Sequence, residues 1–261
     1  MPKTSQPYWV KQTDKPLFED VVWSRPEMRS TAGKLCIVGG HSESFIQPAI
    51  AYDAATKAGI GVARVLMPQS LFKTLKKSYP LAEYASANRS GSFATNALSE
   101  LLMGAHWADA VHLAGDFGKN SETIAMLDNF AGKYSGILAV SHDAADYFCR
   151  QPTALLTRPQ TLLVLTIDQL RTLGASLKTP YAFTSDMALV PLVEQLHELS
   201  IKFPQLLVVT LHETQLVVAV GGRVATTPRK STSPTEISAT AVTWWLQQPA
   251  KPFEAIVSSQ I

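Results

Sequence analysis

The chain has 261 residues, of which 46% are hydrophobic and 17% are charged. This composition is typical of a globular protein, and the length is sufficient for a sizeable core. The 23 basic and 21 acidic residues leave a net charge of +2, so no strong field attracts nucleic acid or an anionic membrane. We therefore expect neither a nucleic-acid partner nor a membrane partner.

The first 33 residues are polar and rich in proline, and we expect an irregular N-terminal arm with Trp9 and Trp23 as anchors. This stretch lacks the apolar core of a signal peptide, and no segment has the roughly 20 apolar residues of a membrane span. A cytoplasmic location is therefore expected. Cys36 and Cys149 make no disulfide framework, and Cys36 stands in an apolar run that favours a core position.

Residues 34–40 form a short apolar run that ends in two glycines, which indicates a buried strand followed by a turn. A helix is predicted over 47–59, with Pro48 in its first turn and Gly59 at its end. A second strand follows over 61–68. A strand, a helix and a strand in this order imply parallel pairing through a right-handed crossover.

The alternation continues along the chain. Further strands are predicted over 108–115, 136–141 and 161–166, and further helices over 120–133, 185–203 and 233–248. Asn120 or Ser121 can cap the first of these helices, and Pro191 is expected to bend the second. Residues 205–228 indicate a strand and then a hairpin that turns at Gly221-Gly222. The pattern predicts one α/β domain over 34–261, with helices on both faces of a mainly parallel sheet.

Asp116-Phe117-Gly118 is the tripeptide that holds magnesium in protein kinases. The glycine-rich loop, the strand lysine and the His-Arg-Asp loop that such an enzyme needs are missing. No P-loop is present, and the six histidines form no metal motif. His142 and Asp143 are neighbours, so on a strand they would point to opposite faces. No metal site is predicted.

In open α/β sheets, ligands bind beyond the carboxyl ends of the strands. The predicted strand ends therefore give a set of candidate substrate-binding residues, which are Gly39, Gly40, His41, Ser42, Asp116, Gly118, Lys119 and Asp143. The segment 116–119 has a second interpretation, since Asp116 could also close a tight turn locally without any ligand.

Several segments, taken in order, resemble the ADP/ATP-dependent NAD(P)H-hydrate dehydratases, which are ribokinase-like enzymes that repair hydrated NADH and NADPH. "KLCIVGGHSESFIQPAIAYDAATKAGIGVARVLMP" resembles the opening of the family, and "ADAVHLAGDFGKNSET" resembles its strand and "GPGLGR" turn. "HETQLVVAVGGRVATTP" is similar to the strands beside the nucleotide. The similarity runs from about Arg25 to Ile256 and implies a three-layer ribokinase-like α/β fold.

The resemblance also implies ATP or ADP as a cofactor, with Mg²⁺ as a further option, although a chain that uses no cofactor stays open. It implies a small-molecule ligand that is a nucleotide or is similar to NAD(P)H, with candidate nucleotide-binding residues Thr210, Thr214, Ser233 and Thr235. The family commonly forms tetramers, so a homo-oligomer is expected, and the arm could pack onto a neighbouring subunit.

The family's Gly-Ser-Gly-Asp motif reads Ser233, Pro234, Thr235 and Glu236 in this chain. Proline has no N–H to offer to a phosphate, and the longer Glu236 side chain moves its carboxylate by roughly 1.5 Å. Glu236 is the candidate catalytic residue, but Ser-x-x-Glu with proline second is also a helix capping box. Two functions remain: a dehydratase or small-molecule kinase with weak or lost catalysis, and a non-catalytic relative that binds a metabolite or a protein.

Overall fold

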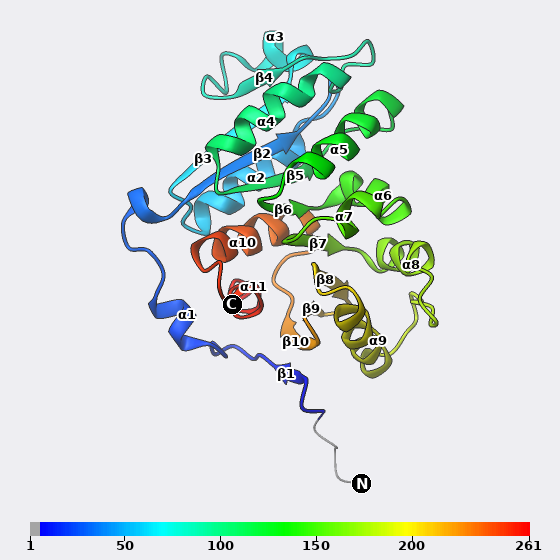
Figure 1. The fold of residues 1–261 in the computed structure, drawn as a ribbon. Coiled ribbons are helices and arrows are strands. Elements are labelled where there is room, and N and C mark those ends of the chain that lie inside the picture. The colour runs from blue at the N-terminus through cyan, green and yellow to red at the C-terminus, as the bar shows by residue number, and fades with distance from the viewer. Residues whose placement is uncertain (1–5) are drawn as a thin grey trace.

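A ten-stranded sheet runs through the molecule in the order β1-β10-β9-β8-β7-β6-β5-β2-β3-β4 (Figure 1). The computed structural model describes residues 6–261. The strands are β1 (Trp9–Lys11), β2 (Lys34–Gly39), β3 (Val62–Pro68), β4 (Glu83–Ala85), β5 (Ala110–Gly115), β6 (Ile137–Val140), β7 (Thr161–Leu165), β8 (Leu206–His212), β9 (Gln215–Val220) and β10 (Arg223–Pro228).

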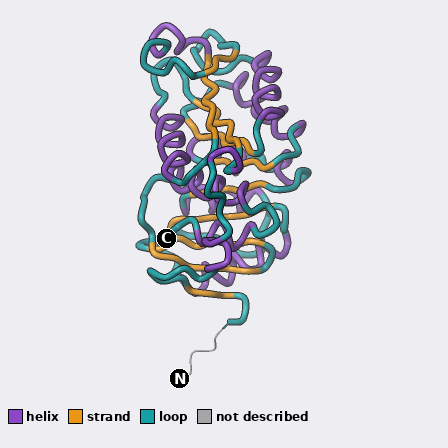
Figure 2. The backbone as a smooth tube through the Cα atoms, turned by 90° about the vertical axis from the view of Figure 1, so that its left-hand side faces the viewer, coloured by secondary structure: helices purple, strands orange, loops and turns teal. Residues whose placement is uncertain are grey.

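The helices are α1 (Glu19–Trp23), α2 (Ile46–Lys57), α3 (Phe72–Leu75), α4 (Leu98–Trp107), α5 (Ser121–Lys133), α6 (His142–Arg150), α7 (Thr153–Leu156), α8 (Ile167–Ser176), α9 (Leu189–Lys202), α10 (Pro234–Gln247) and α11 (Pro252–Ser258). They cover both faces of the sheet (Figure 2). One apolar core joins the sheet to α2, α10 and α11, and the other joins it to α4, α5, α6, α8 and α9. The three predicted layers are therefore confirmed.

The strands pair mainly in parallel, as the alternation of strands and helices predicts. β2 lies between β3 and β5 and is parallel to both. Only the pairs β8–β9 and β9–β10 are antiparallel within the described residues 6–261. Both are hairpins, and the second turns at Gly221-Gly222 as expected. The turn between β8 and β9 contains Glu213 in a left-handed conformation with φ 47°.

One local expectation, the bend at Pro191, is wrong. Helix α9 begins at Leu189, so Pro191 lies in its first turn, where a missing N–H removes no hydrogen bond, and it bends nothing in the helix interior. Strand β6 ends at Val140, within its predicted bounds, and His142 and Asp143 follow it in the first turn of α6.

The N-terminal arm is more regular than its composition suggests. β1 is parallel to β10, and the Trp9 indole N–H donates to the Thr226 hydroxyl at 3.2 Å. Val21 in α1 is fully buried in the core beside α11. Trp9 therefore anchors the arm on its own chain, whereas the Trp23 side chain is 84% exposed.

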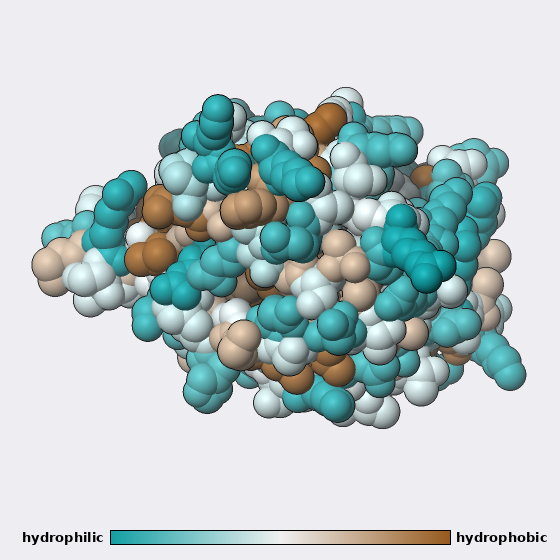
Figure 3. Space-filling view, turned by 90° about the horizontal axis from the view of Figure 1, so that it is seen from above, coloured by the Kyte–Doolittle hydropathy of each residue, from teal (hydrophilic) through white to brown (hydrophobic). Residues whose placement is uncertain are grey.

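No helix within residues 6–261 is both long enough and apolar enough to span a membrane. Figure 3 looks down on the end of the molecule that carries α3 and β4, and its hydrophobic patches are small and separated by hydrophilic side chains. Exposed apolar side chains at this end include Phe72 and Leu81.

Candidate ligand site at the carboxyl ends of the strands

The strand ends of β2 and β5 approach each other closely, and this requires glycine. The Gly40 N–H donates to the Gly115 carbonyl at 3.0 Å, and Gly40 has a φ of +99° that favours glycine. A Cβ atom on Gly39 would lie 2.3 Å from the Gly115 oxygen. Gly39 and Gly40 are both buried, so they shape the site from beneath.

A cavity of about 350 Å³ lies beyond these strand ends. Its lining residues are His41, Ser42, Glu43, Ser90, Ser92, Phe117, Gly118, Lys119 and Asn120. Four of the predicted substrate-binding residues, His41, Ser42, Gly118 and Lys119, are thus brought together. We call this space the strand-end cavity.

Ser90 and Ser92 belong to the same cavity, although no pattern in the sequence indicates this. They come from a loop that folds over the strand ends, where the Ser42 N–H donates to the Gly91 carbonyl at 2.9 Å. The Ser92 hydroxyl donates to the Phe117 carbonyl at 2.7 Å. Such contacts between distant segments leave no periodic signal in the sequence.

The turn after β5 is held from two sides. The Asp116 side chain is 8% exposed, and its Oδ2 accepts from the Gln47 N–H at 2.8 Å. The Gly118 N–H donates to Asp143 Oδ2 at 2.9 Å. Asp116 and Asp143 therefore fix the wall of the strand-end cavity and do not line it.

Two neighbouring strand ends carry left-handed residues that are not glycine. Asp116 has φ 61° and His142 has φ 55°. Such conformations cost about 1–3 kcal/mol each and persist where the surrounding contacts enforce them. His142 Nδ1 lies 3.5 Å from Asp143 Oδ1. The neighbouring Asp143 carboxylate raises the pKa of His142 above its usual value, against the opposing effect of burial.

Local side chains already engage backbone N–H groups at the N-terminus of α10. The Ser233 hydroxyl accepts from the Glu236 N–H at 3.3 Å, as a capping residue does. The reciprocal half of the capping box is absent, because Glu236 Oε2 instead accepts from the Ser231 hydroxyl, and that hydroxyl accepts from the Ser233 N–H at 3.1 Å. The expectation that Glu236 bonds directly to the cap is therefore wrong.

The other candidate nucleotide-binding residues are also engaged or displaced. The buried Thr235 hydroxyl lies 2.7 Å from Gln47 Oε1 and 3.1 Å from the Ala114 carbonyl. The buried Thr210 hydroxyl donates to the Leu165 carbonyl at 3.1 Å. Thr214 lies exposed in the turn between β8 and β9. The structure does not bring Thr210 or Thr214 into the strand-end cavity.

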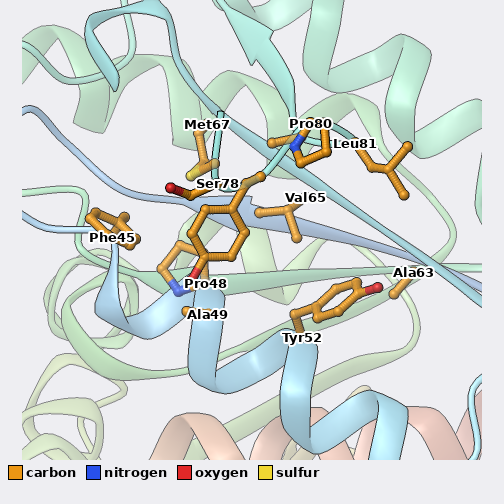
Figure 4. A pocket seen from close by; sticks show the side chains of 12 residues that line it. Phe45, Pro48, Ala49, Tyr52, Ala63, Val65, Met67, Ser78, Pro80 and Leu81 are labelled. Atoms are coloured by element: carbon orange, nitrogen blue, oxygen red, sulfur yellow. The ribbon is translucent and has the colours of Figure 1, made fainter. Parts of the chain in front are cut away.

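A second cavity of about 220 Å³ lies between α2 and residues 78–82 (Figure 4). Phe45, Pro48, Tyr52 and Val65 surround it, and its walls are almost wholly apolar. Within residues 6–261 no group of three or more His, Cys, Asp or Glu side chains is placed to hold a metal ion.

Comparison with solved structures shows which proteins share this fold. No family model matches the sequence, and no curated protein matches it. A ribokinase-like superfamily protein from Enterococcus faecalis superposes with a TM-score of 0.70 at 14% identity, over 95% of this chain and 84% of that one.

Two further neighbours have named activities. The ADP/ATP-dependent NAD(P)H-hydrate dehydratase of Bacillus subtilis, co-crystallised with ATP and Mg²⁺, gives a TM-score of 0.60 at 13% identity, over 94% of this chain and 86% of that one. The pyridoxal kinase of the same organism, solved as an ADP complex, gives 0.52 at 10% identity, over 87% and 88%. The mainly parallel sheet, the two helical layers and these superpositions show that this chain has the ribokinase-like α/β fold.

Proposed function

We propose that this chain binds a small polar metabolite, of the nucleotide or NAD(P)H type, in the strand-end cavity, with little or no nucleotide-dependent catalysis. The cavity offers a lysine, a histidine and several hydroxyl groups, which suit a phosphorylated or polyhydroxylated ligand. The named neighbours act on or were solved with such compounds.

The hydrogen bonds at the N-terminus of α10 are the observation that argues against nucleotide-dependent catalysis. Helix N-termini bind phosphate through free backbone N–H groups. Here Pro234 has no N–H, the Glu236 N–H is engaged by Ser233, and the Ser233 N–H is engaged by Ser231. A nucleotide phosphate at this helix would have to displace these contacts, so the residues present do not fit a phosphate well.

A second candidate is a nucleotide-dependent lyase or kinase that uses Glu236. The observation in its favour is that the Glu236 carboxylate is only half-buried and stands in the first turn of α10, close to where the family motif places its aspartate. The Ser231 hydroxyl that donates to it would then orient a working carboxylate.

Ligand binding is tested by thermal shift with ATP, ADP, AMP, NADH and NADPH, because a ligand that binds the native state raises the apparent stability. We expect at least one of them to raise the melting temperature, and Lys119→Gln to reduce that rise. Lys133→Gln, at the exposed far end of α5, is the matched control and should leave the rise unchanged. A shift equally large in Lys119→Gln would place the ligand elsewhere.

Catalysis is tested with a dehydratase assay on hydrated NADH and NADPH, with ATP and with ADP. Three proteins are compared: the natural chain, Glu236→Gln, and a variant with Ser233→Gly, Pro234→Ser, Thr235→Gly and Glu236→Asp. Removing one preorganised donor costs about 100- to 1,000-fold in rate, so we expect the natural chain to be inactive or nearly so. Robust turnover that Glu236→Gln abolishes would overturn the proposal and establish the second candidate.

We also propose that the chain forms a homo-oligomer, a tetramer being the form that the resemblance implies. Light scattering at micromolar concentration measures the mass directly. A monomer under these conditions would contradict the proposal.

A further inference from the structure

A shallow cleft outside the strand-end cavity combines aromatic rings with negative charge. It has a volume of about 380 Å³ and is lined by Tyr8, Tyr181, Glu194, Gln195, His197 and Glu198. Tyr8 precedes β1, Tyr181 precedes α9, and the other four residues lie on α9 itself. We call this space the α9 cleft.

The aromatic wall of the α9 cleft is held rigidly. The Tyr8 and His197 rings are stacked, with centroids 3.6 Å apart and planes 7° apart. His197 Nδ1 lies 2.6 Å from the Gly222 carbonyl, which can only accept, so this nitrogen carries the proton. The Gly222 contact thus orients His197, and His197 orients Tyr8.

The α9 cleft carries two negative charges, on Glu194 and Glu198. Glu194 and Glu198 are one helical turn apart, a spacing at which like charges repel on a helix surface. No ion pair among residues 6–261 engages either carboxylate. The contact that Glu194 does make is a hydrogen bond from the Gln6 amide at 2.8 Å.

The negative charge of the glutamates affects both tyrosines. The pKa of Tyr8 is raised by burial and then by Glu194 and Glu198, and burial together with Glu198 raises the pKa of Tyr181 to about 12. The charged groups that contribute to these shifts are carboxylates alone. Among residues 6–261, the lining of the cleft therefore offers carboxylate acceptors and tyrosine rings but no lysine or arginine.

We propose that the α9 cleft binds a primary alkylammonium ion. An ammonium group donates three hydrogen bonds and carries the charge that two carboxylates require. Tyrosine faces attract such cations by a further cation–π interaction. Ligands of this chemistry include a free diamine and the lysine side chain of another protein. Binding would also tie the N-terminal arm, through Tyr8, to α9.

The test is titration calorimetry on the full chain, with putrescine as the free diamine and Nα-acetyl-lysine methylamide as the lysine stand-in. We expect at least one of them to bind, and the tighter one identifies the source. Butane-1,4-diol, which has the length of putrescine but no charge, should not bind. Glu198→Gln should weaken binding about fivefold, and Glu194→Gln with Glu198→Gln at least tenfold.

Two controls separate a built site from general electrostatics. Glu27→Gln makes the same charge change on an exposed residue of the segment before β2 and should have no effect. Tyr181→Phe keeps the ring and should bind within twofold of the natural chain, whereas Tyr181→Leu should weaken binding two- to fivefold. Circular dichroism confirms that each variant is folded.

Failure of both amines to bind would overturn the proposal. So would equal competition by potassium chloride at the same ionic strength, or binding that survives both glutamate substitutions, because either result would show an adventitious counter-ion only. These outcomes are independent of the strand-end cavity, whose ligands are tested separately.

Discussion

Gln47 and Thr235 lie 188 residues apart in the chain, and the Thr235 hydroxyl lies 2.7 Å from the Gln47 side-chain oxygen. The backbone N–H of Gln47 donates to Asp116 at the end of β5. One residue of α2 thus connects the N-terminus of α10 to the wall of the strand-end cavity. The segments that form the site are therefore held to one another even without a ligand.

Removing the Thr235 hydroxyl should destabilise the fold. Thr235→Val keeps the shape but leaves Gln47 Oε1 without its donor, and we expect a loss of about 1–2 kcal/mol in the free energy of unfolding. The matched control is Thr243→Val on the same helix, because the buried Thr243 hydroxyl donates only to the Ala239 carbonyl at 2.8 Å. Urea denaturation compares the two. Equal losses would mean that the contact between helices contributes nothing of its own.

The titration of His142 should depend on Asp143. Asp143→Asn removes the neighbouring negative charge that raises the pKa of His142, so that pKa should fall. Asp146→Asn removes a weaker contribution and should produce a smaller fall. Proton NMR of the His142 ring against pH measures both. A pKa that does not move in Asp143→Asn would show that this neighbour does not control the ring.

His112 should make the fold sensitive to acid. Its side chain is fully buried in β5, with Nε2 3.0 Å from the Ser141 hydroxyl, and burial lowers its pKa from 6.5 to about 3. Between these two values the unfolded chain binds more protons than the folded chain, so stability falls as the pH falls. The contribution of His112 is complete above pH 6.5 and is lost towards pH 3, by about 1.4 kcal/mol per pH unit in between.

The measurement is the free energy of unfolding at pH 6 and at pH 5 for the natural chain and for His112→Gln. The carboxylates titrate in both proteins, so the difference between the two slopes isolates His112. His106→Gln, on the exposed surface of α4, should leave the slope as it is. If His112→Gln has the natural slope, the buried ring does not titrate as described.

Arg158 should be hard to replace. It is 5% exposed and donates to the carbonyls of Tyr134 and Gly136, at 2.9 and 2.6 Å, and to the Thr161 hydroxyl at 2.6 Å. Burial lowers its pKa to about 10, so it remains charged at neutral pH. The planar guanidinium of arginine reaches these separate acceptors at the same time, whereas the single ammonium group of a lysine cannot.

We expect Arg158→Lys to cost about 2–3 kcal/mol in the free energy of unfolding, because buried carbonyl groups lose their donors. Arg150→Lys, at the exposed end of α6, makes the same exchange and should be nearly neutral. Urea denaturation of both variants decides the matter. A small loss for Arg158→Lys would contradict the role given to the guanidinium fork.

The order of strands and helices could be predicted because buried parallel strands are short apolar runs and the helices between them are amphipathic. β2, α2 and β3 all lie where the sequence places them. The segment between β3 and β5 gave no prediction, although Leu98, Leu101 and Ala105 recur at helical spacing in α4.

The site was predicted less completely. Strand ends correctly identified His41, Ser42, Gly118 and Lys119 as neighbours, since parallel strands end at one side of a sheet. The bond from Ser231 to Glu236 and the contact of Gln47 with Thr235 depend on side-chain directions that no spacing rule contains. For the same reason, Trp9 could be expected to anchor the arm, but its partner strand could not be foreseen.

The position of β1 has a consequence for solubility. β10 is a six-residue strand, and β1 is paired along the side of it that β9 does not cover. At the other end of the sheet the last strand, β4, has only three residues. Without the first twelve residues, β10 would present unpaired N–H and C=O groups, the kind of edge that recruits strands from other molecules. By covering this edge, β1 should protect the chain from aggregation. We expect a chain shortened by those residues to precipitate at concentrations at which the full chain stays in solution.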